Sequence, residues 1–256
     1  MGFENNIRIW NDTVNKCEMI RTRSDKSIKY DYLDITPVKR YDKMDVIVRN
    51  VDSIKGGMVL LNMGFNPVVL NLADDVFPGG HVRMGSGAQE ESLFRRTNYY
   101  QTLNHETGFY PLVNTELVYS PSVLVIKDEN NRDLDLAEYF RISFIACPGI
   151  KKPKLIDGKF RNLDKELFKK KIKNILNVAY NHNHDSVVLG ALGCGAWECP
   201  QEEVAHLFKE VVDEYNLCFK FILFAILDVD KGDYIVKNEN LNKSNYEIFS
   251  KILENR

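Results

Sequence analysis

The sequence predicts an α/β protein in which helices cover both faces of a largely parallel or mixed sheet. Short runs of β-branched and apolar residues alternate with longer segments whose apolar residues recur every three or four positions. Strands separated by helices at this spacing are typical of layered α/β domains. The 256-residue chain is 44% hydrophobic, and no Pro/Gly/Ser-rich linker divides it. We therefore expect one domain with a substantial core.

The N-terminal part differs from the rest of the chain. Residues 4–20 place apolar side chains at three- and four-residue intervals, which predicts an amphipathic helix at the edge of the domain. Residues 21–43 are polar and aperiodic, so we expect a surface connection with one short strand. We assign residues 1–44 to an N-terminal helical extension packed on the core, and residues 45–256 to the core itself.

Strand and helix signals alternate from residue 45 onward. Residues 46–51 are β-branched and predict a strand. Asp52 or Ser53 would cap a helix that runs to about residue 63 despite two internal glycines. The same signals predict further strands at 67–72, 119–126, 142–147, 186–189 and 218–227, and further helices at 89–103, 163–180, 200–215 and 246–253.

The predicted helix at 163–180 carries a run of lysines, which comprises Lys169, Lys170, Lys171 and Lys173. Such a run would contact a polyanion or simply form a solvated helix face. The solvated face is the favoured interpretation, because charge runs on helices usually face water.

The composition argues against several classes of protein. A net charge of -2 and a pI near 6.2 give no general attraction to nucleic acid or anionic membranes, so loops must hold any phosphate locally. No apolar run reaches transmembrane length, and the first residues lack the features of a signal peptide. We expect an intracellular protein of the cytoplasm, with the nucleus left open, that makes no membrane contact.

The cysteines and histidines do not predict a metal site. The five cysteines are scattered and lack a C-x-x-C pair, which disfavours both a disulfide scaffold and a zinc site. His105, His182 and His184 lack a clustered set of cysteines or carboxylates, so exposed loops are the favoured interpretation for them. We expect neither a metal nor a cofactor.

A glycine-rich loop follows the predicted strand at 67–72. It has four glycines between Gly79 and Gly87, and Glu90 and Glu91 open the helix that comes next. Glycine lets a backbone come close to a ligand, and the N–H groups at a helix start attract anions. These features predict a phosphate-bearing substrate beside a carboxylate acid or base.

A second glycine loop covers residues 190–197. It lacks the Gly-Lys-Ser/Thr of a Walker A motif and the order of a dinucleotide fingerprint, which disfavours a kinase or a nucleotide-dependent oxidoreductase. If this loop is considered by itself, a tight strand-to-helix turn explains its glycines equally well. Two such loops at neighbouring strand ends, however, would together hold a diphosphate. Trp197 would then stack on a base or ribose, although a lone Trp is more often a core residue.

Glu90 and Glu91 also have a simpler interpretation, because acidic residues in the first turn of a helix complement its dipole. Neighbours on a helix point about 100° apart, so both side chains reach one pocket only if it lies across the helix start. The dipole lowers the pKa of a carboxyl group there, whereas burial and a like charge raise it. We expect one glutamate to be the acid and the other to bind ribose hydroxyls.

The ordered motifs resemble those of the microbial-type poly(ADP-ribose) glycohydrolases (PARGs), whose fold is an ADP-ribose-binding macrodomain. The family pattern is a strand that ends in Asn-x-Ala, then Pro-Gly-Gly-Gly and, after a spacer, Gln-Glu-Glu at a helix start. The segments 119–121, 147–148 and 188–197 are similar as well. The resemblance covers most of the chain, from the N-terminal helix to the apolar strand near Leu227. The residues that match the first part of the pattern are Asn71, Ala73, Pro78, Gly79, Gly80, Gln89, Glu90 and Glu91.

The resemblance implies a three-layer α/β/α fold with a mixed central sheet, in which Glu91 is the catalytic acid/base and Glu90 orients the ribose. His81 departs from the pattern, since it replaces the third glycine and adds a Cβ and an imidazole where backbone approaches ligand. Glu198-Cys199 also stand where a basic or amide-bearing pair is common. The implied substrate-binding residues are Asn71, Ala73, Gly79, Gly80, His81, Gln89, Gly190, Gly193, Cys194, Gly195, Ala196 and Trp197.

The implied reaction is hydrolysis of the ribose-ribose O-glycosidic bonds of poly(ADP-ribose), with release of ADP-ribose. Glu91 would protonate the leaving oxygen and then accept a proton from water. The partners would be poly(ADP-ribose) or ADP-ribosylated proteins, and we expect a monomer without sequence-specific nucleic acid binding. Two alternatives stay open: a non-catalytic module that binds ADP-ribose, and an ADP-ribosyl hydrolase for another linkage.

Overall fold

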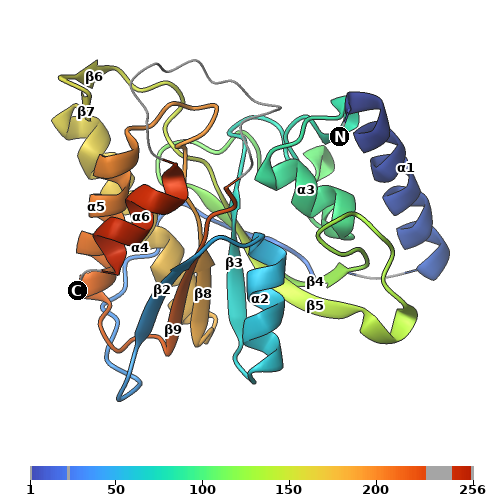
Figure 1. The fold of residues 1–256 in the computed structure, drawn as a ribbon, viewed down its shortest axis with the longest axis horizontal. Coiled ribbons are helices and arrows are strands. Elements are labelled where there is room, and N and C mark those ends of the chain that lie inside the picture. Colours follow the sequence, from blue (N-terminus) through green and yellow to red (C-terminus); the bar gives the residue numbers. More distant parts are fainter. Residues whose placement is uncertain (1, 22–23, 229–243, 255–256) are drawn as a thin grey trace.

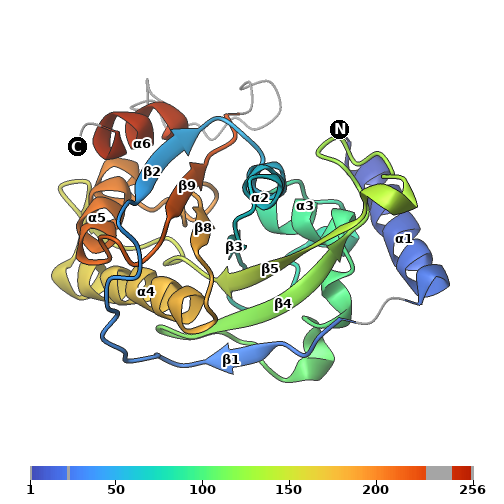
Figure 2. The same cartoon turned by 90° about the horizontal axis from the view of Figure 1, so that it is seen from below.

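A seven-stranded mixed sheet forms the centre of the molecule, in the strand order β1-β4-β5-β3-β8-β9-β2. The computed structural model describes residues 2–21, 24–228 and 244–254. Figures 1 and 2 show the sheet from two directions, and in Figure 2 β1 and β2 lie at opposite edges. The predicted α/β fold with a mixed sheet is confirmed.

The middle strands run parallel and position the site. β3 (Pro67–Leu72) pairs in parallel with β5 (Phe140–Cys147) on one side and with β8 (Ser186–Leu189) on the other. All three are buried over most of their length, as expected for parallel strands that are covered on both faces. Because the carboxyl ends of parallel strands lie at one edge, the segments that follow β5, β3 and β8 meet there.

The outer strands make the sheet mixed. β9 (Phe221–Ala225) and β2 (Asp45–Arg49) continue the parallel part beyond β8. β4 (Leu117–Val125) and β1 (Ile28–Tyr30) are antiparallel and extend the sheet beyond β5. β1 is the short strand expected within the polar segment 21–43.

The helices form two layers, one on each side of the sheet (Figure 1). α4 (Asn162–Asn181), α5 (Gln201–Glu214) and α6 (Asn245–Leu253) share a hydrophobic cluster with Leu70 of β3. The neighbouring Val69 points the other way and joins the cluster of the opposite layer. Within the described ranges, no helix is long and apolar enough to span a membrane.

The opposite layer consists of α1 (Phe3–Ile20), α2 (Ser53–Asn62) and α3 (Gln89–Arg96). α1 contacts α3 and the 3-10 helix η1 (Val82–Met84), so the N-terminal helix packs beside the glycine loop. The buried indole of Trp10 belongs to this cluster.

The helix expected at 89–103 is shorter than predicted, because α3 ends at Arg96. The backbone of Thr97 is extended, with φ -141°, and a separate 3-10 helix follows at Tyr99–Gln101. The carbonyl oxygen of Arg96 accepts a hydrogen bond from Ile126 N at 2.9 Å, and Asn98 N donates to the carbonyl of Leu124 at 3.1 Å. Pairing with the end of β4 therefore replaces the next helical turn.

The lysine run of α4 does not share one solvated face. Lys170 is exposed, whereas Lys169 and Lys173 form ion pairs with α5. Lys171 is buried, with 3% of its surface exposed, so the solvated position predicted for it was wrong. It follows Phe168 by three positions, and residues three apart on a helix lie on the same face. The fully buried Phe168 places that face inward.

Two adjacent glycines let α2 approach the sheet closely. Asp52 caps this helix, since its Oδ1 accepts a hydrogen bond from Lys55 N at 2.9 Å. A Cβ on Gly57 would lie 2.4 Å from Ile142 Cδ1 and 3.0 Å from Val69 Cγ2. The glycine lowers helix propensity but permits the contact between helix and sheet.

We expect Gly57→Ala to destabilise the protein by about 1–3 kcal/mol, because the added methyl group would overlap Ile142. Helix propensity alone favours alanine by up to about 1 kcal/mol, so the sign of the change separates the two effects. Urea unfolding measures it. Val59→Ala, at an exposed position of the same helix, is the control and should change stability by less than about 0.5 kcal/mol. A more stable Gly57→Ala protein would contradict the close packing.

Candidate active site

The first glycine loop leaves β3 and returns over the start of α3. Asn71 and Ala73, at the end of β3, are buried. Gly79 and Gly80 have φ values of +80° and +56°, which side chains other than glycine rarely adopt. A Cβ on Gly79 would lie 2.6 Å from the Phe94 ring, and one on Gly80 would lie 2.4 Å from Glu91 Oε1. The loop backbone therefore lies directly against the helix that carries the two glutamates.

Glu90 is buried and accepts three hydrogen bonds. Its Oε1 accepts from Gly79 N at 3.1 Å and from Asn71 Nδ2 at 3.2 Å, and its Oε2 accepts from Asp74 N at 2.7 Å. Burial raises the pKa of Glu90 to about 8, against the hydrogen bonds from Asp74 and Asn71, and the charge of Glu91 adds to the increase. A carboxylate has about four lone-pair positions, so three hydrogen bonds leave one, which carries the proton below about pH 8 and is available to hydrogen-bond a ligand hydroxyl.

Glu91 is also buried, but its two oxygens differ. Oε1 accepts a hydrogen bond from His81 N at 3.0 Å. Oε2 is buried and has no hydrogen-bond partner among the described residues. A Cβ on Gly80 would approach both carboxylates, at 2.4 Å from Glu91 and 3.1 Å from Glu90. Both glutamates thus reach one place across the helix start, which is the geometry that they need to act together.

Gln89 fixes the helix start to the sheet. Its Oε1 accepts from Leu72 N at 2.9 Å, while its Nε2 donates to Leu70 O at 2.8 Å and to Ser53 Oγ at 3.1 Å. Both ends of the amide are therefore used by protein groups. The side chain holds β3, α2 and α3 in register rather than pointing into open space.

His81 occupies the third position of the glycine motif without backbone strain. Its φ of -105° is ordinary for any residue. The imidazole is exposed, and its ring centroid lies 5.6 Å from that of Phe77. Only the backbone N–H of His81 contacts Glu91, so a side chain at this position leaves the hydrogen bond to the glutamate intact.

The second glycine loop follows β8 and lies beside the first. Gly190 lies beside the side chain of Leu72, since a Cβ on Gly190 would lie 3.5 Å from both methyl groups of that leucine. Gly193 has φ +74°, and a Cβ there would lie 2.6 Å from Cys199 Sγ. Cys194 is buried, whereas Gly195 and Ala196 are exposed. The two loops therefore meet at the edge where β3 and β8 end, as the sequence predicted.

Two histidines predicted in exposed loops are buried or half-buried instead. His184 is 3% exposed, donates from Nδ1 to the carbonyl of Asn66 at 3.0 Å, and accepts from Tyr119 OH at 3.0 Å. Burial lowers its pKa to about 4, which fits this neutral tautomer. The ring of His182 stacks on Tyr119, with centroids 3.7 Å apart. His105 is exposed as predicted.

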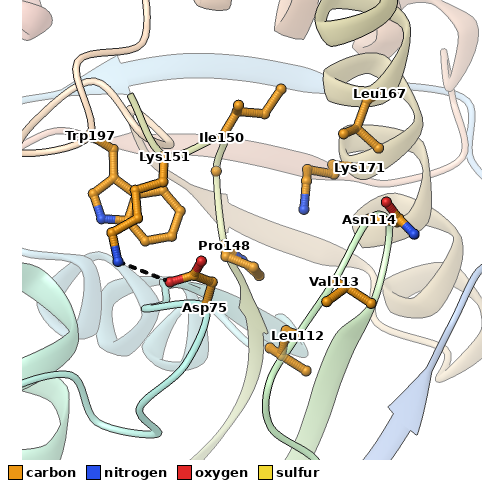
Figure 3. Close-up of a pocket in the computed structure, with 11 residues that line it drawn as sticks. Asp75, Leu112, Val113, Asn114, Pro148, Ile150, Lys151, Leu167, Lys171 and Trp197 are labelled. Atoms are coloured by element: carbon orange, nitrogen blue, oxygen red, sulfur yellow. Dashed lines mark hydrogen bonds and ion pairs between the residues drawn. The ribbon is translucent and has the colours of Figure 1, made fainter. Parts of the chain in front are cut away.

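Several residues near the site had no sequence signal. The buried hydroxyl of Tyr110 has no partner among the described residues, and the charge of Glu90 contributes, after burial, to its raised pKa. Asp75, Lys151 and Lys171 line a cavity together with Trp197 (Figure 3). In the part of the chain that the structure describes, no group of three or more His, Cys, Asp or Glu residues is arranged to hold a metal ion.

The raised pKa of Glu90 predicts a pH-dependent stability. This carboxyl group titrates near 4.5 when unperturbed and near 8 in the folded protein, so the folded state binds more protons between these values. Stability is then lost as the pH rises through this window. Between about pH 5 and pH 8, we expect the free energy of unfolding to fall by roughly 2–5 kcal/mol more in the native protein than in Glu90→Gln. Parallel pH profiles in urea unfolding would contradict the raised pKa.

Comparison with known proteins bears on this geometry. The model of the family described as microbial-type PARG, catalytic domain, matches residues 10–128. No curated protein matches the chain. The PARG of Thermomonospora curvata has a similar structure, with 21% identity, 97% of this chain and 99% of that chain covered, and a TM-score of 0.76.

Structures with bound molecules are similar too. The T. curvata enzyme bound to the inhibitor ADP-HPD has 21% identity, the same coverage and a TM-score of 0.74. The PARG of Deinococcus radiodurans in complex with ADP-ribose has 22% identity, 84% of this chain and 86% of that chain covered, and a TM-score of 0.70. These likenesses establish the fold. Together with the family match over residues 10–128, they confirm the resemblance to microbial-type PARGs indicated by the motifs, and the fold is that of PARG structures.

Proposed function

We propose that the protein hydrolyses the ribose-ribose O-glycosidic bonds of poly(ADP-ribose) and releases ADP-ribose, with Glu91 as the acid/base. The family match and the fold support PARG activity. The observation that carries the assignment of Glu91 is its Oε2, a buried carboxylate oxygen without a partner among the described residues. It lies on the helix start that the glycine loop covers.

The division of roles between the glutamates follows from their hydrogen bonds. Both oxygens of Glu90 accept from N–H groups, so this residue is held in place and has one position left to hydrogen-bond a ribose hydroxyl. Glu91 keeps one oxygen unengaged, and a general acid needs such an atom to reach the leaving oxygen. We therefore infer that Glu90 orients the ribose and that Glu91 moves the proton.

The proposed reaction has two proton transfers. Glu91 donates its proton to the leaving ribose oxygen as the bond at the anomeric carbon breaks and positive charge develops there. Glu90 would keep the ribose oriented during this step, because its own hydrogen bonds to the loop hold it in place. Glu91 then accepts a proton from the attacking water, and the site returns to its starting state.

The two loops would hold the diphosphate of the same ADP-ribose unit. In the described part of the chain, the N–H groups of Gly195 and Ala196 donate to no acceptor, and both residues are exposed. Backbone N–H groups in a glycine loop form a concave site for phosphate oxygens. The side chain of Trp197, which is half-buried, would pack against the bound unit.

The wider assignments are proposals of the same kind. We propose that residues 45–256 form the catalytic core and that residues 1–44 extend it. The protein would act inside the cell as a monomer on poly(ADP-ribose) or ADP-ribosylated proteins. Binding of ADP-ribose without cleavage, and cleavage of another ADP-ribosyl linkage, are the competing functions. A panel of substrates with different linkages distinguishes them by which one releases ADP-ribose.

Glu91→Gln should reduce release of ADP-ribose from poly(ADP-ribose) by about 10²- to 10⁴-fold, the usual contribution of a general acid. Affinity for ADP-ribose should change little, because the phosphate-binding loops are intact. Chromatography measures the release and calorimetry the binding. Glu106→Gln, at an exposed position in another segment, is the control and should keep full activity. A native protein that binds poly(ADP-ribose) without releasing ADP-ribose would instead be a binding module.

Gly80→Ala should reduce turnover by more than about tenfold, because its Cβ would displace the Glu91 carboxylate. Part of any effect comes from strain, since φ is +56°. Gly64→Ala is the matched control, with φ +82° and no atom within 4 Å of the added Cβ. Both variants should lose about 1 kcal/mol of stability in urea unfolding, but only Gly80→Ala should lose activity. Equal activities would place Glu91 outside the reaction.

A further inference from the structure

A cavity of about 210 Å³ lies beside the first glycine loop (Figure 3). Glu90 and Glu91 are not among the residues that line it, but its wall begins next to them. Asp74 donates its backbone N–H to Glu90, and the following residue, Asp75, lines the cavity. Trp197 of the second loop lines it too. The cavity therefore adjoins the site of the proposed reaction.

The cavity lies beyond the two glycine loops. Those loops follow β3 and β8, whereas the segment Pro148–Lys151, which forms one wall, follows β5. In the sheet β5 is on the side of β3 away from β8. A ligand held between the two loops and a group held in the cavity would therefore occupy neighbouring positions along the edge of the sheet. We call this cavity the Lys171 pocket, after the residue that α4 contributes.

Lys171 is a buried cation without a counter-ion. Its side chain is 3% exposed, and among the described residues it has neither a hydrogen-bond acceptor nor an ion pair. In Figure 3 its ammonium group points into the pocket, across from Lys151 and Trp197. Burial lowers the pKa of this ammonium group, and the smaller opposing effects of Cys147 and then Asp75 do not cancel the change. Burying a charge without a partner lowers the stability of the fold, and binding of an anion would explain why Lys171 is buried.

A second lysine that is buried among the described residues, Lys127, provides the comparison. The side chain of Lys127 is also 3% exposed, but its Nζ lies 2.5 Å from both Asp12 and Asp133. Lys127 therefore joins two carboxylates in ion pairs, which is the usual arrangement of a buried cation. Lys171 has no such pair, and the nearest carboxylate on the wall, that of Asp75, is paired with Lys151 at 3.2 Å. The pocket thus presents positive charge that the protein itself does not neutralise.

The size of the pocket indicates what kind of anion it would take. Sites for drug-sized ligands measure about 300–1,000 Å³, so the Lys171 pocket suits one part of a larger substrate. Lys151 is half-exposed and stands over the Trp197 ring, 5.4 Å from its centroid. An ammonium group on the wall and a second one at the rim have the chemistry of a binding site for a phosphate group.

We propose that the Lys171 pocket binds a phosphate of the second ADP-ribose unit of the polymer, the unit next to the one that is released. This inference rests on the proposed function, since it names a subsite of the same reaction. The unit to be released occupies the two glycine loops, and the next unit continues past Trp197 to Lys171. The subsite would make the protein prefer poly(ADP-ribose) to its free product.

The test compares two ligands, ADP-ribose and a poly(ADP-ribose) fragment of two units, by calorimetry in the Glu91→Gln background. Lys171→Met should weaken binding of the fragment about 10- to 100-fold, the contribution of a charge-assisted hydrogen bond. The affinity of this variant for ADP-ribose should stay within about twofold of the affinity of the Glu91→Gln protein that retains Lys171. Lys171→Arg should retain most of the preference. Lys170→Met, which removes an exposed lysine from the same helix, is the matched control and should leave both affinities unchanged.

Two results would overturn the proposal. Equal losses for both ligands would place Lys171 in the site of the released unit, and no loss for either would show that the pocket binds no anion. Lys171→Met should not lower the midpoint of urea unfolding, because it removes an unpaired charge. A lowered midpoint would make Lys171 a structural residue. A native protein that prefers the fragment to ADP-ribose but does not cleave it would refute the proposed activity. The proposal that the Lys171 pocket binds a phosphate would still hold.

Discussion

The carboxylate of Glu90 joins the parts of the candidate site. It is 3% exposed and accepts N–H groups from Asn71, Asp74 and Gly79, so one side chain holds the end of β3, the glycine loop and the start of α3. Hydrogen bonds of this kind are strong where water is excluded, and an unpaired group there is costly. Gln89 fixes the same helix start to β3, and the two side chains together set the approach of Gly80 to both glutamates.

The anchor leaves the neighbouring glutamate comparatively unconstrained. Among the described residues, Glu91 accepts one hydrogen bond, from His81 N to Oε1, and its Oε2 has no hydrogen-bond partner. A residue that only stabilised the fold would use both oxygens, as Glu90 does. The protein thus combines a fixed carboxylate with one that retains an unengaged atom, and this asymmetry is what two carboxylates need for different roles.

Local features of the site could be predicted from sequence, because strand, glycine loop and acidic helix start follow one another within 25 residues or so. The end of α3 could not, since the carbonyl of Arg96 pairs with Ile126, far along the chain. The burial of His184 likewise depends on Tyr119, which reaches it from another strand. Lys171 is an intermediate case. Its spacing of three positions from Phe168 places it on the inward face of the helix, but the neighbouring lysines favoured a solvated face.

The order of strands would let one edge of the sheet bind two successive units of the polymer and so distinguish the polymer from its product. β5, β3 and β8 are neighbours, and each is followed by a segment that lines the loops or the Lys171 pocket. Adjacent strands are about 4.8 Å apart, so the three strand ends together extend over roughly 10 Å. A fold that bound only a single unit between β3 and β8 would have no use for an unpaired cation behind β5. Keeping Lys171 buried and, among the described residues, unpaired lowers stability, and such a cost is typical of positions that serve binding.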